Sequence, residues 1–340
     1  MSSGRLLLAK AGVRCLDPMQ TSAAQRPARL AAGVVGVGRV GAVLGAALAA
    51  AGHQVVAASA VSEASRARAQ ALLPGVPIRT PPDVLAQADL VLLTVPDDEL
   101  AELVSGLVAI DAVRPGQLLA HTSGRFGVGV LAAATGAGAL PLALHPAMTF
   151  TGTSVDLARL AGCSFGVTAP EPLRPVAEAL VVEMGGEPQW VAEEHRALYH
   201  AALANAANHL VTLVASSSDL LRRCGVDNPG HLLGPLLGAA LDNALRSGDA
   251  ALTGPVVRGD AGTVAAHLAE LAQVSTEAYD AYVAMARLTA DRALAAGLLS
   301  AERAETLLDV LAGPLTRPPG LGSSEGPWHG PPDGPSDGAP

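Results

Sequence analysis

Three glycines at fixed spacing form the most informative short motif of the chain. Gly36, Gly38 and Gly41 follow the pattern GxGxxG and lie between an apolar run over residues 30–35 and an apolar helical pattern over residues 40–51. In a strand–turn–helix unit, the first glycine permits the tight turn, the second lets the backbone approach a pyrophosphate, and the third lets helix and strand pack closely. The amide groups of the helix N-terminus then bind the phosphates. The motif therefore predicts a dinucleotide-binding site.

The residues after the next predicted strand favour NADPH over NADH. An NAD site usually carries an acidic residue about 20 residues beyond the glycines, against the 2′-hydroxyl of the ribose. Here that place is taken by Ser59. Ser59 and Ser62 can bond to a 2′-phosphate, and the candidates to neutralise it are Arg39, Arg66 and Arg68. Glu63 can instead take the role of the acidic residue, which leaves NADH as the alternative.

Further contacts with the cofactor are predicted at the ends of buried strands. Apolar runs lie within residues 89–96, 116–124 and 138–148, and continuous apolar runs are typical of parallel strands covered on both faces. Open α/β sheets bind ligands at the carboxyl ends of such strands. His121 and His145 lie at two of these strand ends, where each either faces the nicotinamide or is structural. We assign His145 to the substrate, and the cofactor set is Gly36, Gly38, Arg39, Val40, Gly41, Ser59, Arg66, Val95, Pro96, His121 and Ser123.

A polar stripe marks a long helical pattern in the second half of the chain. Asn205, Asn208, His209, Thr212 and Ser216 are spaced by three or four residues and therefore share one face of a helix. Burying such groups without partners costs about 1 to 3 kcal/mol each. The stripe therefore indicates a substrate site, hydrogen bonds between helices, or a dimer contact.

A second polar cluster lies in the segment "LTGPVVRGDAGTVAAH". Arg258 stands on a glycine-flanked loop, and an arginine suits a carboxylate because it offers two parallel hydrogen bonds. We expect Arg258 to bind a substrate carboxylate, with Asp260 and Thr263 beside it. Capping of the following helix is the alternative role of Asp260.

The elements that must position these residues form two domains. Strand and helix patterns alternate as far as residue 192, with the last strands near 163–169 and 188–192. This alternation predicts an α/β Rossmann domain over residues 29–192, with a doubly wound, mainly parallel sheet.

Only helical patterns remain from Glu193 onward. One long helix is predicted to end at Gly225, and an all-α substrate and dimerisation domain is expected over residues 193–316. Its other helices are predicted near residues 229–247, 262–296 and 300–312. Residues 1–28 are expected to be a disordered leader and residues 317–340 a disordered Pro/Gly-rich tail.

The composition argues against several classes of function. The formal net charge is −9 and only 2% of residues are aromatic, so neither a basic patch nor a base-stacking surface for nucleic acid is expected. The three cysteines lack metal-ligand spacing, which predicts no metal site, no disulfide framework and a cytoplasmic location. No segment is expected to span a membrane.

Seven segments together resemble a known family. In order they are "GVGRVG", "VPDD", "HTSG", "LHPAMTF", "YHAALANAANHL", "ALDNAL" and "LTGPVVRGDAGTVAAHL". Over about residues 29–313 they are similar to proteins that join a Rossmann-like domain to a domain of unknown function, DUF2520. That family resembles a branch of the 6-phosphogluconate dehydrogenase superfamily, beside pyrroline-5-carboxylate reductase and ketopantoate reductase.

The resemblance implies NADPH-dependent reduction of a small 2-oxo acid, first of all ketopantoate in pantothenate biosynthesis, by a homodimer formed through the all-α domain. The alternatives are a reductase of cyclic imines of the pyrroline-5-carboxylate type and a non-catalytic NADP-binding sensor or scaffold.

One departure from the related reductases concerns the proton donor. Those enzymes use a lysine on the first helix of the α-domain, whereas the only lysine of this chain is Lys10. The expected donor is therefore His209 or His200 on the corresponding helix, because histidine exchanges protons near neutral pH. Asn205 and Asn208 are expected to polarise the substrate carbonyl.

Overall fold

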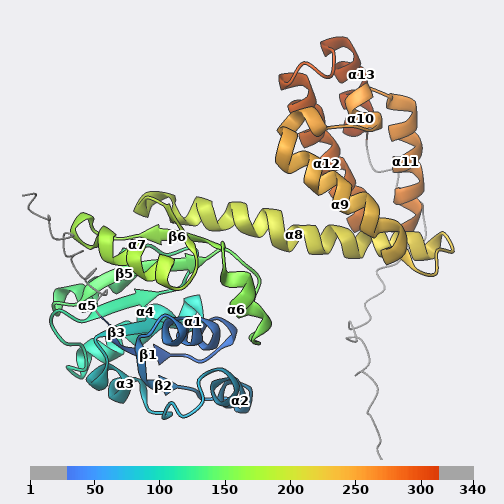
Figure 1. Cartoon of the computed structure of the whole chain (residues 1–340). Coiled ribbons are helices and arrows are strands. Elements are labelled where there is room, and N and C mark those ends of the chain that lie inside the picture. The colour runs from blue at the N-terminus through green and yellow to red at the C-terminus, as the bar shows by residue number, and fades with distance from the viewer. Residues whose placement is uncertain (1–28, 314–340) are drawn as a thin grey trace, which may run out of the picture. The chain divides into compact units, whose positions relative to one another are not determined.

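The computed structural model describes residues 29–313 of the chain (Figure 1). The predicted leader over residues 1–28 and the predicted tail over residues 317–340 lie outside the described residues. Internal contacts divide the chain into two compact units, the first ending at Asn208 and the second beginning at His209. Within residues 29–313, every helix is too short or too polar to cross a bilayer.

A seven-stranded sheet forms the centre of the first unit (Figure 1). Its order is β2-β1-β3-β4-β5-β6-β7, and all neighbouring strands are parallel except β5 and β6. The reversal of strand order between β1 and β3 is the place where doubly wound sheets bind nucleotides. The strands are β1 (Ala31–Val35), β2 (Gln54–Ser59), β3 (Leu90–Leu93), β4 (Leu118–His121), β5 (Leu140–Pro146), β6 (Ser164–Thr168) and β7 (Glu187–Trp190).

Helices cover both faces of this sheet, which explains the continuous apolar strands. One core joins the sheet to α1 (Arg39–Ala50), α2 (Glu63–Leu72), α6 (Val155–Leu160) and α7 (Arg174–Glu183). The core on the opposite face joins it to α3 (Pro81–Gln87), α4 (Asp97–Ala109) and α5 (Ala132–Gly136). Both cores consist mainly of Ala, Val and Leu. The predicted Rossmann architecture is confirmed.

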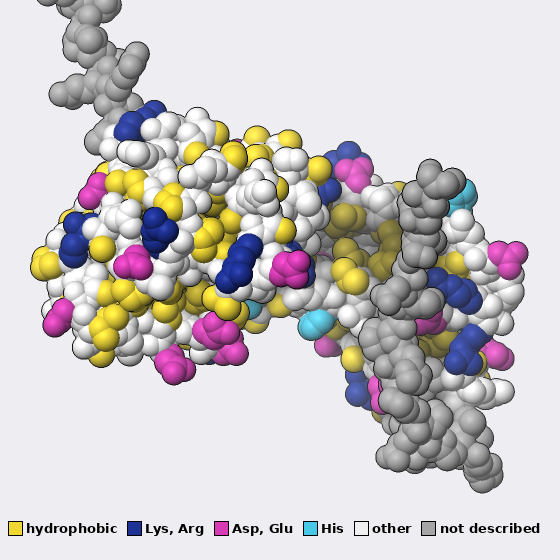
Figure 2. Space-filling model, turned by 90° about the horizontal axis from the view of Figure 1, so that it is seen from below, with side chains coloured by type: hydrophobic (Ala, Val, Ile, Leu, Met, Phe, Trp, Pro, Cys, Tyr) yellow, Lys and Arg dark blue, Asp and Glu magenta, His cyan; other side chains and the backbone are white. Residues whose placement is uncertain are grey.

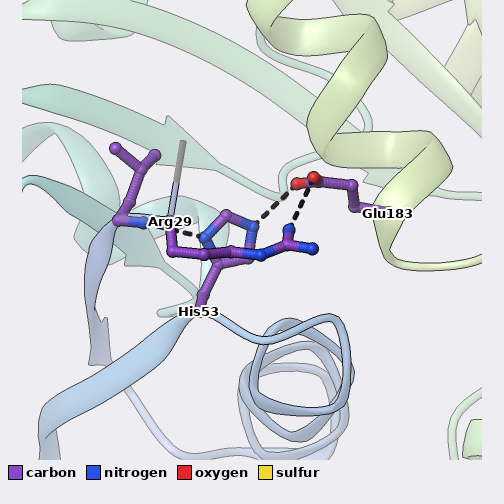
Figure 3. A network of polar contacts seen from close by, with 4 residues as sticks. Arg29, His53 and Glu183 are labelled. Carbon is purple, nitrogen blue, oxygen red and sulfur yellow. Dashed lines mark hydrogen bonds and ion pairs between the residues drawn. The ribbon is translucent and has the colours of Figure 1, made fainter. Parts of the chain in front are cut away.

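A polar network fastens the amino end of the sheet to α7 (Figure 3). The Glu183 carboxylate binds Arg29 Nη1 at 2.7 Å and His53 Nε2 at 2.8 Å. The amide of Leu30 donates a hydrogen bond of 3.1 Å to His53 Nδ1. Because Nδ1 is an acceptor in this contact, Nε2 must carry the proton that points at Glu183. The network thus links the start of β1, the start of β2 and the last turn of α7.

The second unit is helical. Helix α8 (Arg196–Arg223) begins in the first unit and ends in the second. Buried residues of the later helices form a core that includes Val264, Ala293 and Leu307, none of which is exposed. The further helices are α9 (Pro229–Ser247), α10 (Pro255–Arg258), α11 (Ala261–Val274), α12 (Thr276–Ala295) and α13 (Ala301–Ala312).

The prediction of a single helix over residues 262–296 is wrong, because α11 and α12 occupy this segment. Ser275 lies between α11 and α12 in an extended conformation, with φ −160° and ψ 121°. Its hydroxyl accepts a hydrogen bond from the amide of Ala278 at 3.1 Å and so caps α12. Serine competes with the helical backbone in this way, and an apolar periodicity that continues through the break does not reveal it.

Candidate functional site

The glycine turn between β1 and α1 is held by Thr94 at the end of β3. The Thr94 hydroxyl donates to the carbonyl oxygen of Gly36 at 2.5 Å. Gly36 has φ +93°, which glycine adopts at little cost. A Cβ on Gly41 would clash with both the Gly36 carbonyl and the Thr94 hydroxyl. The turn therefore requires glycine at positions 36 and 41 for internal reasons.

Gly38 differs from the other two glycines because a side chain there would meet open space, with no atom within 4 Å. Its φ of −76° is available to any residue. The fold itself therefore does not require glycine at this position, whereas a pyrophosphate approaching the N-terminus of α1 would. Val40 and Val95 are half-buried beside the turn, and Pro96 is the N-cap residue of α4. The residues present fit a dinucleotide.

A hollow of about 440 Å³ opens at the carboxyl end of β2. Its polar lining consists of Ser59, Arg66, Arg79, Thr80 and Asp83. The Thr80 hydroxyl donates to Asp83 at 2.7 Å, so this carboxylate already has a donor. Two guanidinium groups and a hydroxyl in one hollow suit a phosphate group.

Arg39 and Arg68 come together at another place. Gly152, in the segment after β5, has φ +81°, and a Cβ on it would lie 2.9 Å from Arg68 Nε and 3.1 Å from Arg39 Cγ. Asp156 fixes this segment by accepting hydrogen bonds from the amides of Thr151 and Gly152. These two arginines, predicted as phosphate ligands, thus flank one glycine beside the N-terminus of α1.

His121 is fully buried at the end of β4, and both of its ring nitrogens bond to the chain. Nε2 donates to the Gly127 carbonyl at 2.8 Å, and Nδ1 accepts from the Ser123 amide at 3.2 Å. Burial lowers the pKa of His121 to about 4, so the ring is neutral at pH 7. The Ser123 hydroxyl accepts from the amide of Phe126 at 3.2 Å. In this geometry His121 and Ser123 shape the loop after β4.

His145, predicted as a substrate residue, meets two residues from the start of α8. Its Nδ1 lies 2.9 Å from the Tyr199 hydroxyl, and its ring centroid is 6.1 Å from that of His200. A Cβ on Gly124 would lie 2.6 Å from His200 Cδ2 and 3.0 Å from His145 Nε2. Two predicted site histidines therefore converge on a glycine in the loop after β4, at the carboxyl edge of the sheet.

Arg196 lies beneath this cluster and is 1% exposed. It donates from Nε to Phe126 O at 2.8 Å, from Nη1 to Gly166 O at 3.0 Å and from Nη2 to Ser123 O at 2.6 Å. Burial lowers the pKa of Arg196 from its usual value, but an arginine remains charged. A full positive charge is therefore fixed next to the histidines.

The other predicted catalytic residues lie farther along α8. Asn205, Asn208 and His209 are exposed, and each takes part in an interaction within the chain. Of the four residues predicted to be catalytic, His200 is the one that lies beside His145.

The residues predicted around a substrate carboxylate lie in the second unit. Arg258 is exposed at the end of α10. Asp260 caps α11, accepting hydrogen bonds from the Thr263 amide at 3.1 Å and the Thr263 hydroxyl at 2.7 Å. The Thr263 hydroxyl is the main cause of a lowered pKa at Asp260, to which the nearby charge of Arg258 contributes.

Four residues of these clusters were not singled out in the sequence: Thr94, Arg79, Arg196 and Tyr199. Thr94, Arg196 and Tyr199 contact residues distant in the chain, and Arg79 lines a hollow together with Ser59 and Arg66, neither of which local spacing reveals. The segment "HRALYH" did contain a signal, because Arg196, Tyr199 and His200 lie three and four residues apart on one helix face. Within the described residues, no group of three or more His, Cys, Asp or Glu side chains is arranged to hold a metal ion.

Two family descriptions match the chain. A Rossmann-like domain matches residues 16–146, and a domain of unknown function, DUF2520, matches residues 163–289. No curated protein matches the chain.

Several solved structures share the fold. The Bacteroides fragilis protein BF3122, provisionally named an NADP oxidoreductase, is 23% identical over 77% of this chain and 98% of its own, with a TM-score of 0.63. The protein TM1727 of Thermotoga maritima is 23% identical over 76% of this chain and 98% of its own, with a TM-score of 0.57.

A third similar structure is the Plasmodium falciparum pyrroline carboxylate reductase with NADP bound. It is 11% identical over 82% of this chain and 98% of its own, with a TM-score of 0.51. At such identities the likeness concerns the fold. The two family matches by themselves show that the chain belongs to the proteins in which a Rossmann-like domain is joined to a DUF2520 domain.

Proposed function

We propose that the protein is an oxidoreductase that uses a nicotinamide dinucleotide. The observation that carries this proposal is the glycine turn, where the fold needs Gly36 and Gly41 for its own packing but leaves open space at Gly38. A pyrophosphate explains that space. The bound forms described for similar structures support the same class of cofactor, since the Plasmodium falciparum reductase holds NADP.

NADPH is the proposed form of the cofactor. Support comes from the hollow at the end of β2, which is lined by Ser59, Arg66 and Arg79, because the ribose of the adenosine half binds near the end of the second strand in a Rossmann domain. When bound, NADPH would supply a hydride. The chain would hold the 2′-phosphate with Arg66 and Arg79, and the pyrophosphate with the amides at the start of α1.

The cofactor proposal is tested by titrating the protein with NADPH and NADH in parallel. The double variant Arg66→Ala/Arg79→Ala is expected to weaken NADPH binding at least tenfold and to leave NADH binding within twofold. Arg39→Ala/Arg68→Ala tests the second arginine pair in the same way. Arg174→Ala is the matched control, because Arg174 is an exposed arginine of the same unit that pairs with Glu171 on another surface. Equal losses for both cofactors would contradict a site for the 2′-phosphate.

The proposed substrate is a small 2-oxo acid, with ketopantoate as the first candidate. The family resemblance supports it, and Arg258 offers an exposed guanidinium for the substrate carboxylate. Arg258→Lys is expected to raise KM at least tenfold, because an ammonium group cannot form the same two parallel hydrogen bonds. NADPH affinity is expected to stay unchanged in that variant.

A cyclic imine is the second candidate substrate, since a pyrroline carboxylate reductase shares the fold. NADPH oxidation measured with ketopantoate, pyruvate, 2-oxoisovalerate and 1-pyrroline-5-carboxylate decides between the two classes. If the protein binds NADPH tightly but reduces none of these compounds, the proposal that it is an enzyme is contradicted, and a non-catalytic NADP-binding sensor is favoured.

We also propose that the protein is a homodimer formed through the helical unit. Of the 28 residues of α8, Arg196 alone is buried, and of the 19 residues of α9 only Pro229 and Leu233 are buried. On α9, exposed leucines include Leu236 at 60% and Leu245 at 79%. A helix with apolar residues on all sides is typical of a buried position. A second copy of the chain would provide the missing cover.

A further inference from the structure

The pair of His145 and Tyr199 contains a ring nitrogen that the fold does not use. Nδ1 of His145 contacts the Tyr199 hydroxyl at 2.9 Å, whereas Nε2 has no hydrogen bond within residues 29–313. His121 on the neighbouring strand differs, because both of its ring nitrogens bond to the chain. His145 is therefore held by one nitrogen and can offer the other to a ligand.

The free nitrogen lies close to Gly124, where the packing leaves no room for a side chain. A Cβ on Gly124 would lie 3.0 Å from His145 Nε2. Gly124 belongs to the loop that follows β4, on the carboxyl edge of the sheet, where a doubly wound fold binds its ligands. Since no buried side-chain nitrogen or oxygen of residues 29–313 lacks a hydrogen-bond partner, the unbonded Nε2 is open to solvent, and a carbonyl oxygen can reach it from that side.

Burial, together with the groups around it, keeps the His145 ring neutral. From α8 it faces Arg196, Tyr199 and His200, and from β4 it faces His121. Burial and the charge of Arg196 lower the pKa of His145 to about 4. The carboxylate of Glu193, three residues before α8, accepts hydrogen bonds from the amides of Val128 and Gly129, and Asp97 of α4 acts on His121 and Arg196. His145 therefore cannot store an extra proton at pH 7 and needs a partner that provides one.

Tyr199 is the group placed to provide that proton. Burial raises the pKa of Tyr199 above its ordinary value, and the charge of Arg196 opposes this rise. Arg196 lies over the Tyr199 ring, with Cζ 5.5 Å from the ring centroid, so it would stabilise a phenolate more than a phenol. The hydroxyl thus stays protonated at neutral pH and can still release its proton to a strong base.

We infer that Tyr199 and His145 form a proton relay to the substrate: Nε2–H of His145 protonates the carbonyl oxygen while Nδ1 takes the hydroxyl proton of Tyr199. The inference rests on the proposed function and names the proton donor that the missing lysine leaves open. Bound NADPH would supply the hydride to the carbonyl carbon, and the carbonyl oxygen would gain the Nε2 proton. A proton from water then restores Nε2–H while Nδ1 returns its proton to the Tyr199 phenolate, so both residues regain their starting state. Proton transfer along the relay is favourable, because an alkoxide is about as basic as hydroxide, whereas a phenolate is a weaker base whose conjugate acid has a pKa of about 10.

The pH dependence of kcat tests the relay in the unmodified protein. Neither member of the relay changes its protonation between pH 6 and 9, so kcat is expected to stay level over that range. A histidinium donor would instead make kcat fall tenfold per pH unit above the pKa of that donor. Such a fall would overturn the relay.

The variant Tyr199→Phe keeps the ring and removes the proton. We expect kcat to fall about 10²-fold, the lower end of general acid catalysis, with KM and NADPH affinity within twofold. The chain supplies a matched control: His267 and Tyr282 form an almost identical pair in the second unit, with 2.9 Å between Nδ1 and the hydroxyl. Tyr282→Phe is expected to leave kcat within twofold.

A readout independent of turnover comes from the nitrogen resonances of the histidine rings. In the wild type, the His145 signal is expected to show a neutral ring down to about pH 4 and to shift in Tyr199→Phe at neutral pH. An active wild type in which Tyr199→Phe retains full kcat would overturn the relay alone. A wild type that binds NADPH but reduces none of the four test compounds would overturn the proposed function and the relay with it.

Discussion

The glycines of the turn separate two demands on single residues, one from the fold and one from the ligand. Gly38→Val is expected to leave the free energy of unfolding within about 0.5 kcal/mol of wild type, because nothing lies within 4 Å of the new Cβ. NADPH binding is expected to be lost, since the side chain fills the space of the pyrophosphate. Gly41→Ala is expected to cost about 1 to 3 kcal/mol of stability, because its Cβ meets the Gly36 carbonyl and the Thr94 hydroxyl.

Denaturant unfolding and NADPH titration measure the two effects separately. Gly106→Ala in α4 is the control, because no atom lies within 4 Å of its new Cβ and alanine favours a helix by roughly 0.5 to 1 kcal/mol. A Gly38→Val protein that still binds NADPH with wild-type affinity would remove the pyrophosphate from this turn.

His121 makes stability depend on pH. Its pKa is about 4 in the folded protein and about 6.5 in the unfolded chain, so the unfolded chain binds more protons between these values. Stability is therefore complete above pH 7 and falls as the pH is lowered toward 4. Linkage gives a loss on the order of 2 kcal/mol at pH 5 from this residue. Urea unfolding at pH 7.5 and pH 5 measures it.

The comparison with His121→Asn isolates the contribution of the imidazole. This variant is less stable at pH 7.5, but it is expected to lose less between pH 7.5 and pH 5 than the wild type does. An equal loss in both proteins would assign the pH dependence to other groups, among which His145 has the same sign.

At the scale of elements, the break between α11 and α12 depends on one hydroxyl. Ser275→Ala removes the acceptor of the Ala278 amide and is expected to cost about 1 kcal/mol. Ser300 is a matched control, since it also precedes a helix, α13, but makes no side-chain capping bond. Thermal unfolding should therefore show a larger loss for Ser275→Ala than for Ser300→Ala.

Elements were predictable where their signal is local. The apolar runs predicted every strand from β3 to β6, and the glycine spacing predicted the turn before α1. The antiparallel placement of β6 beside β5 was not predictable, because a covered strand shows the same apolar run in either direction. Arg196 is the clearest example of a site residue that was not predicted from the sequence. It contacts carbonyl oxygens 30 to 73 residues away, and spacing rules cover only residues close in the chain.

At the scale of the whole molecule, apolar side chains remain at the surface. On the face shown in Figure 2, hydrophobic side chains reach the surface between widely spaced charged groups. If α9 is covered by a second copy, Leu236→Glu is expected to shift the protein from dimer to monomer in sedimentation. Ile110→Glu is the control, because Ile110 is 61% exposed and belongs to the first unit. A monomeric wild type would contradict the dimer.

The network of Arg29, His53 and Glu183 also provides a spectroscopic reporter. Its geometry fixes one tautomer of His53, with the proton on Nε2, and the ring is 5% exposed. A proton so shielded and bonded to a carboxylate exchanges slowly with water and gives a resolved downfield resonance. The exchange lifetime of this proton measures how often the amino end of the sheet separates from α7. It therefore reports local unfolding at the sheet edge opposite the proposed ligand site.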